Sequence, residues 1–70
     1  MSDTAQKIAA EYNLAPDVAE RIVADVTEHI DGLGSRTEAE ADIALEYAHQ
    51  VPDCTDFAAL VGRIERLYQA

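Results

Sequence analysis

Apolar residues recur every three or four positions along most of this chain, and acidic residues occupy many of the positions between them. This spacing is that of an amphipathic helix, which has one apolar face and one polar face. No stretch alternates apolar and polar residues as a half-buried strand does. The sequence therefore predicts an all-α fold. The spacing is clearest in one segment, whose apolar positions are Ala15, Val18, Ala19, Ile22, Val23, Val26 and Ile30.

Residues that end or begin helices divide the chain into four parts. Asn13 can end a helix in a left-handed conformation, and Pro16 suits the first turn of the next one. Gly32 is expected just after that second helix, with Leu33 sealing its end by an apolar contact. Pro52 interrupts the chain again. We predict a single acidic domain over residues 1–70, a small bundle of four short helices at about 4–12, 16–31, 36–50 and 54–69.

Polar residues that can accept a hydrogen bond from a free backbone N–H predict where these helices start. A capping residue followed three positions later by Glu or Gln is the strongest such signal. The predicted caps are Asp3 with Gln6, Ser35 with Glu38, Thr37 with Glu40, and Asp53 or Thr55 for the last helix.

The charge balance limits the functions available to the chain. Its 70 residues include 14 acidic and five basic residues, which gives a formal net charge of −9. With 49% hydrophobic residues the chain can still form one small core, so disorder is not expected. The negative surface disfavours phosphate substrates, nucleic acid and anionic membranes. Because like charges repel in the compact state, salt is expected to stabilise the fold.

Residues 8–22 resemble a helix-turn-helix motif. Ala9 takes the place of the small contact residue, Asn13 that of the turn glycine, and Leu14 that of the turn hydrophobe. Ala19 and Ile22 would pack the second helix against the first. The resemblance implies a helix-turn-helix-like first pair of helices and, as an alternative function, a DNA-binding regulator.

The charges near this motif argue against DNA binding. A helix that reads DNA needs donors for base edges and cations for phosphates. The exposed face of the second helix would instead offer Asp17, Glu20, Arg21, Asp25 and Glu28. DNA binding would regain support if the basic residues converged on one face of the fold: Lys7, Arg21, Arg36, Arg63 and Arg66.

Catalytic, metal and cofactor sites are not expected. His29 and His49 each lie near the end of a helix, where the helix dipole favours a protonated imidazole. Cys54 is the only cysteine, and we expect it to be a half-buried structural thiol. No pair among these residues has a recognised metal-ligand spacing. The single thiol and the lack of a secretory signal at the N-terminus predict a cytoplasmic protein that does not enter a membrane.

Tyrosine and leucine provide the apolar candidates for an interface. Tyr12, Tyr47 and Tyr68 are expected at the edge of the core with their hydroxyls in water. Leu45 lies off the apolar stripe, so Leu45 together with Tyr47 would mark a partner surface or a homodimer contact if both were exposed. Leu67 is a second candidate for such a contact in an assembly.

The sequence predicts a non-enzymatic protein-binding or regulatory module whose acidic helices meet a basic partner. In the extreme form its carboxylates would imitate the phosphates of a nucleic acid. A structural subunit of a larger assembly is a further alternative, and the chain is expected to be a monomer or a homodimer. The partner-binding residues predicted on the second and third helices are Asp17, Glu20, Asp25, Glu28, Glu38, Glu40, Asp42 and Glu46.

Overall fold

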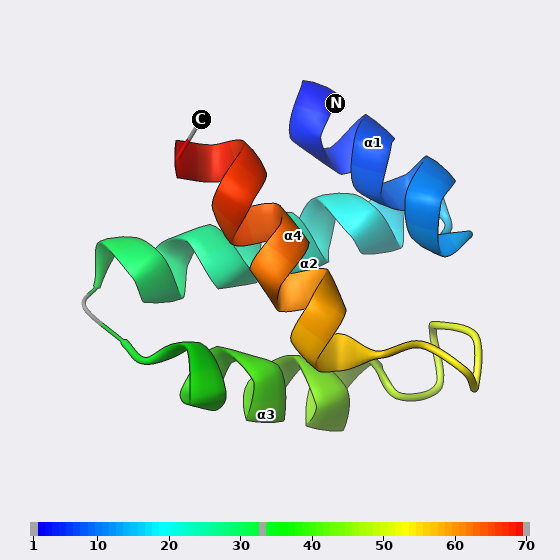
Figure 1. The fold of residues 1–70 in the computed structure, drawn as a ribbon. Coiled ribbons are helices and arrows are strands. Elements are labelled where there is room, and N and C mark those ends of the chain that lie inside the picture. Colours follow the sequence, from blue (N-terminus) through cyan, green and yellow to red (C-terminus); the bar gives the residue numbers. More distant parts are fainter. Residues whose placement is uncertain (1, 33, 70) are drawn as a thin grey trace.

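The computed structural model describes residues 2–32 and 34–69, which form four α-helices (Figure 1). The predicted all-α bundle is confirmed, and the described residues contain no strand. The helices are α1 Asp3–Tyr12, α2 Pro16–Asp31, α3 Arg36–Tyr47 and α4 Phe57–Gln69.

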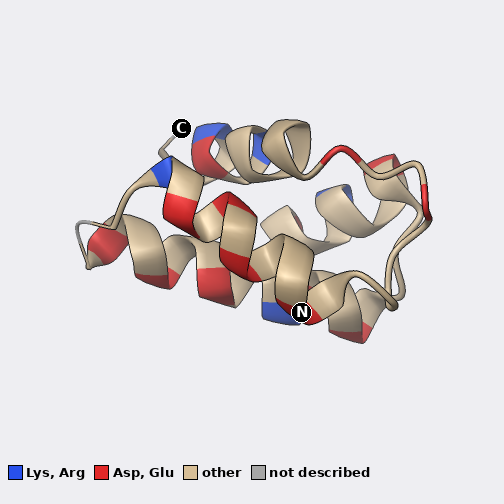
Figure 2. Cartoon of the chain, turned by 90° about the horizontal axis from the view of Figure 1, so that it is seen from below, with Lys and Arg blue, Asp and Glu red and all other residues tan. Residues whose placement is uncertain are grey.

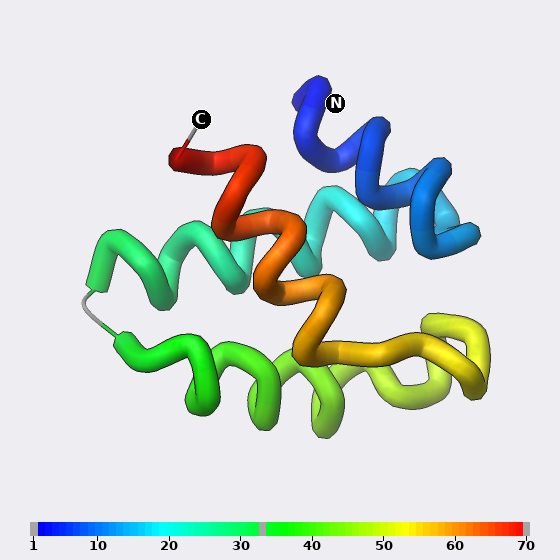
Figure 3. Tube along the Cα trace, in the orientation of Figure 1, coloured from blue at the N-terminus to red at the C-terminus, as the bar shows by residue number. Residues whose placement is uncertain are grey.

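The arrangement places α2 and α4 at the centre of the bundle. Each of these two helices contacts the other three, whereas α1 and α3 share no contact within the described ranges. The α2 and α3 helices run side by side in opposite directions, and α4 crosses in front of α2 (Figures 1 and 3). The acidic helices α2 and α3 therefore form a pair, which positions the candidate site.

The core is apolar and draws on all four helices. Its largest fully buried side chains are Ile8 from α1, Ile22 and Val26 from α2, Ile43 from α3, and Leu60, Val61 and Ile64 from α4. Burying one such side chain stabilises the folded state by about 1.5–3 kcal/mol relative to leaving it exposed. These are the positions that the helical spacing predicts, so the apolar stripes do face one another.

The first two helices begin and end close to their predicted bounds, but some of their caps differ from the predicted ones. Ser2, not Asp3, caps α1, because its Oγ accepts from the Ala5 N–H at 3.2 Å. Asn13 adopts the predicted left-handed conformation, with φ 56°. Gly32 follows α2 with φ −84°, so it is not a left-handed cap. The predicted seal by Leu33 lies outside the described residues.

The connection between α3 and α4 is longer than predicted (Figure 3). The α3 helix ends three residues early, at Tyr47, because a turn forms at 48–50 and the residue before Pro52 is biased away from helical geometry. The α4 helix begins at Phe57, and its cap is Asp56, whose Oδ1 accepts from the Ala59 N–H at 3.2 Å. The predicted caps Asp53 and Thr55 are therefore wrong, because both lie in the preceding loop.

The start of α3 agrees with one of its two predicted capping boxes. The Ser35 Oγ accepts from the Glu38 N–H at 3.1 Å, while Thr37 lies inside the helix. Ser35 thus fixes the first turn of α3 beside the end of α2.

Candidate functional site

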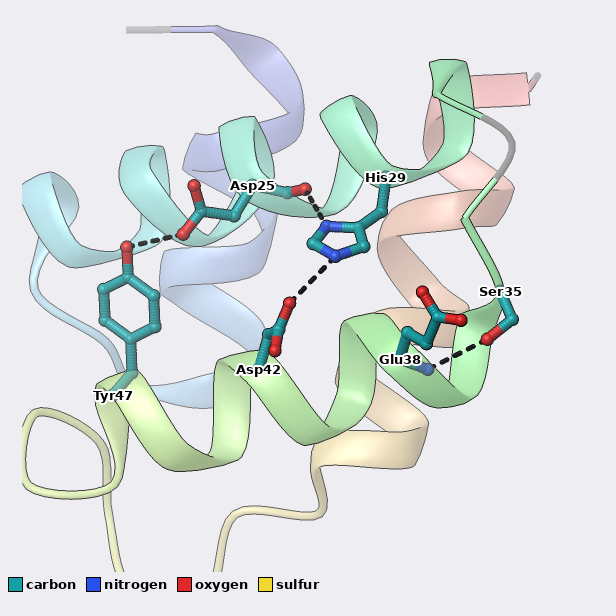
Figure 4. A network of polar contacts seen from close by, with 6 residues as sticks. All are labelled: Asp25, His29, Ser35, Glu38, Asp42 and Tyr47. Carbon is teal, nitrogen blue, oxygen red and sulfur yellow. Dashed lines mark hydrogen bonds and ion pairs between the residues drawn. The ribbon is translucent and has the colours of Figure 1, made fainter.

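A buried tyrosine connects α3 to α2. The Tyr47 side chain is only 4% exposed, and its hydroxyl donates to Oδ2 of Asp25 at 2.9 Å (Figure 4). Burial raises the pKa of Tyr47 to about 12, and the bond to Asp25 raises it in the same direction. The prediction that the hydroxyl of Tyr47 lies in water is therefore wrong, because a carboxylate on the neighbouring helix satisfies it.

His29 makes a second connection between the same helices. Its Nδ1 lies 3.0 Å from the backbone oxygen of Asp25, and its Nε2 lies 2.9 Å from Oδ2 of Asp42 (Figure 4). Both partners only accept hydrogen bonds, and a neutral imidazole has a single N–H. Both contacts are therefore hydrogen bonds only when His29 is a cation.

The surroundings of His29 favour this cation. The bond to the Asp25 carbonyl raises the pKa of His29 most, partial burial lowers it, and the carboxylate of Asp42 raises it. The charge of Glu38 on α3 adds to the increase. His29 also lies in the last turn of α2, where the helix dipole favours a positive charge.

An open concavity of about 290 Å³ lies beside this imidazole. Its lining includes Asp25, Glu28 and His29 of α2, together with the glycines that follow the helix. The backbone approaches closely here, because a Cβ on Gly34 would lie 3.2 Å from Cδ2 of His29. The concavity is therefore acidic, with one imidazole in its wall.

The structure divides the eight predicted partner-binding acids into two sets. Five of them lie near the junction of α2 and α3. Each one either bonds to His29 or Tyr47, raises the pKa of one of these two residues, or lines the concavity beside His29. We call this set the α2–α3 face: Asp25, Glu28, Glu38, Asp42 and Glu46.

The other three acids lie apart from this face. Glu40 acts on Arg36, at the side of α3 nearer to α4. Asp17 and Glu20 are exposed near the start of α2, far along the helix from His29. Two members of the face are also less available to a partner than predicted. Asp25 is half-buried and accepts a hydrogen bond from Tyr47, and Asp42 is bonded to His29.

The basic residues converge only in part. Arg36, Arg63 and Arg66 line one concavity on α4. Arg21 lies on α2, where its charge acts on Tyr47. Acidic segments recur along both α2 and α3 in Figure 2, so the exposed face of α2 offers DNA little positive charge.

The packing of the first helix pair agrees with the helix-turn-helix resemblance. Leu14, Ala19 and Ile22 are buried, and Ala9 packs against the core. The packing of α1 against α2 accounts for these residues by itself, so they are no evidence of DNA binding.

Two other expectations about side chains, for Cys54 and Leu67, are wrong, and the condition for a shared surface of Leu45 and Tyr47 is not met. Cys54 is exposed, because it lies in the long α3–α4 loop and not in a helix. Leu67 is partly buried against the core, so it is not an exposed contact. Leu45 is 86% exposed, but Tyr47 is buried, so the two do not share a surface.

Several side-chain pairs between helices are not predicted by the sequence, and two of them join a tyrosine to a carboxylate. Tyr47 and Asp25 are 22 positions apart, and Tyr68 donates to both carboxylate oxygens of Asp31 at 2.8 Å across 37 positions. No local spacing signals such a pair. The only available signal is the position of each tyrosine on an apolar stripe, which places it next to a neighbouring helix.

The described residues contain neither a cluster of metal-ligating side chains nor a helix that could cross a membrane. No three His, Cys, Asp or Glu side chains among residues 2–32 and 34–69 lie close enough together to hold a metal ion. None of the helices in that part of the chain has the length and apolar character needed to cross a membrane.

Comparison with known proteins identifies no relative. No protein-family model matches the chain, and no curated protein or solved structure is significantly similar to it. A function for the chain therefore has to follow from its own geometry and charge.

Proposed function

We propose that the chain is a non-enzymatic protein-binding module that docks a basic partner on the α2–α3 face. The observation that carries this proposal is the pairing of two acidic helices, which brings five predicted carboxylates from different parts of the sequence to one junction. Charges gathered on one face steer a partner of opposite charge and fix its orientation.

The two bonded acids give this face a fixed geometry. Tyr47 holds Asp25, and His29 holds Asp42, so these carboxylates are ordered before any partner arrives. Glu28, Glu38 and Glu46 are exposed on the same face. A guanidinium or ammonium group of a partner would therefore meet exposed carboxylates beside ordered ones.

The experiment compares two triple variants of the intact chain in binding an arginine-rich peptide. The face variant carries Glu28→Gln, Glu38→Gln and Glu46→Gln. The control carries Asp17→Asn, Glu20→Gln and Asp53→Asn, which removes the same charge at exposed positions outside the face. Calorimetry at two salt concentrations gives the affinity of each.

The face variant is expected to lose at least about fivefold in affinity and the control less than about twofold. Carboxylates that touch the peptide attract its charges more strongly than distant carboxylates, whose attraction is screened by salt. In nuclear magnetic resonance spectra of the wild type, the amide shifts should concentrate on α2 and α3. Equal losses in both variants would show that only net charge attracts the peptide, and the carboxylates would then be a solubilising surface.

A further inference from the structure

The outer side of α4 carries a concavity of about 340 Å³ whose chemistry differs from that of the rest of the molecule. Three of the five basic residues line it, in a chain with a net charge of −9. Arg63 and Arg66 come from α4, and Arg36 comes from the first turn of α3. Blue segments of α4 lie at the edge of Figure 2 opposite the acidic length of α2.

Small residues on α4 create the space. Ala58, Gly62 and Arg66 follow one another at four-residue spacing, so they share one face of the helix. Gly62 lies beneath Arg36, because a Cβ added there would be 4.0 Å from the Arg36 Nη1. The guanidinium of Arg36 therefore lies over a stretch of helix without bulky side chains.

Carboxylates outside the concavity hold two of the arginines in place. Glu11 of α1 accepts from Nε of Arg63 at 2.9 Å and from Nη2 at 3.0 Å. Glu65 accepts from Nη2 of Arg36. A guanidinium has five N–H donors, so each of these arginines keeps donors for another acceptor. The two guanidinium groups are thus already ordered, so a ligand would not have to immobilise them on binding.

Arg66 supplies the remaining positive charge. It is exposed and forms no ion pair with any residue in the described ranges. Glu11 and Glu65 bind the guanidinium groups of Arg63 and Arg36, and the charge of Glu40 also acts on Arg36. Arg66 is therefore the arginine of this concavity that no carboxylate of the described residues pairs. Tyr12, which is partly buried, adds an aromatic ring to the lining.

We propose that this concavity binds the phosphate group of a small organic phosphate of about mononucleotide size. Planar guanidinium groups match the oxygen geometry of phosphate and can bind it through paired N–H donors. The volume lies at the small end of the range of about 300–1,000 Å³ for small-molecule sites, and it exceeds what inorganic phosphate alone would fill. This site lies apart from the α2–α3 face and does not depend on the function proposed for that face.

The test is an amide-shift titration of the intact chain with adenosine monophosphate, inorganic phosphate and adenosine. With the nucleotide, shifts are expected to saturate and to concentrate at residues 58–66 and at Tyr12. Inorganic phosphate should bind at the same place more weakly, and adenosine should cause no saturable shift there.

Two variants that remove the same charge give the control. Arg66→Gln is expected to weaken nucleotide binding at least about fivefold, because charge-assisted bonds are lost. Arg21→Gln on α2 should change it by less than about twofold, since it acts only through screened charge. Each variant makes the net charge more negative by one and loses no ion pair among the described residues, so the two are expected to change the melting temperature by small and similar amounts.

Four results would overturn the proposal: no saturable shift with the nucleotide, equal losses in both variants, inorganic phosphate binding as tightly as the nucleotide, or adenosine binding at the same residues. Tighter binding of a single-stranded oligonucleotide than of adenosine monophosphate at these residues would assign the concavity to nucleic acid instead.

Discussion

His29 joins the end of α2 to the middle of α3, with its Nε2 2.9 Å from Oδ2 of Asp42. The opposite nitrogen of the ring is 3.0 Å from the backbone oxygen of Asp25. Because both partners accept and neither donates, protonation of one imidazole decides whether both contacts are hydrogen bonds. The α2–α3 junction is thus linked to pH through His29.

We expect this link to appear as a pH-dependent stability. The pKa of His29 is raised in the folded state, so the charged form binds its partners in the native protein. Its stabilisation is complete below the unfolded-state pKa of about 6.5 and is lost as the pH rises through the higher folded pKa. Urea unfolding of the wild type should therefore show a midpoint that falls across that interval.

The variant His29→Gln should lose this fall, while His49→Gln should keep it. His49 is exposed in the turn after α3 and makes no side-chain hydrogen bond within the described chain, so it is a matched control. The same pH dependence in His29→Gln and in the wild type would contradict a role for the His29–Asp42 contact.

The bond between Tyr47 and Asp25 should contribute measurably to the free energy of unfolding. A hydrogen bond to a charged group contributes about 1.5–3 kcal/mol, and Tyr47→Phe also leaves the half-buried carboxylate without this donor, so we expect a loss of about 2 kcal/mol. Tyr68→Phe removes the same kind of bond, to Asp31, from a side chain that is 44% exposed. That control should cost about 0.5 kcal/mol or less.

Chemical denaturation of the single variants, of Asp25→Asn and of the double variant completes the measurement. The Tyr47→Phe and Asp25→Asn changes should be non-additive, because Tyr47→Phe removes the bond and Asp25→Asn removes the charge that strengthens the same bond. Additive costs would show that burial of the ring, and not its bond to Asp25, accounts for the loss.

Helical spacing was sufficient to predict four helices and their core faces, because each apolar stripe reports which side of its own helix is buried. Ile22, Ile43 and Ile64 are fully buried as their spacing predicts. The spacing was not sufficient to predict where α3 ends and where α4 begins. Several polar residues lie between 48 and 56, and which of them caps a helix depends on how the loop around Pro52 packs.

The candidate site was predictable in part for the same reason. A sequence shows which carboxylates lie on the outside of a helix, but not how far that helix is rotated about its axis relative to its neighbour. Packing turns Asp42 toward His29 and Glu40 toward Arg36, although both acids belong to one helix. Tyr47 reaches Asp25 only once α2 and α3 lie side by side.

The net charge of −9 should make the fold more stable in salt. Repulsion between exposed charges is screened over about 10 Å at 0.1 M salt, and few opposite charges compensate it here. We expect the melting temperature to rise by several degrees from low to high sodium chloride, which corresponds to about 1 kcal/mol in a domain of this size. The face variant with three fewer carboxylates should show a smaller rise. A melting temperature that does not change with salt would contradict this prediction.

Ile43 and Leu45 lie on opposite sides of α3, with exposed fractions of 1% and 86%. Ile43→Ala should lower the free energy of unfolding by about 2–5 kcal/mol, because it removes buried methyl groups and leaves a cavity. Leu45→Ala should change it by less than about 0.5 kcal/mol if the side chain faces water. Denaturation of the wild type and of Leu45→Ala at several protein concentrations, together with sedimentation of these two proteins, distinguishes a monomer from an assembly. A concentration-dependent loss in Leu45→Ala, together with a smaller sedimenting species, would show that Leu45 is covered by another copy of the chain.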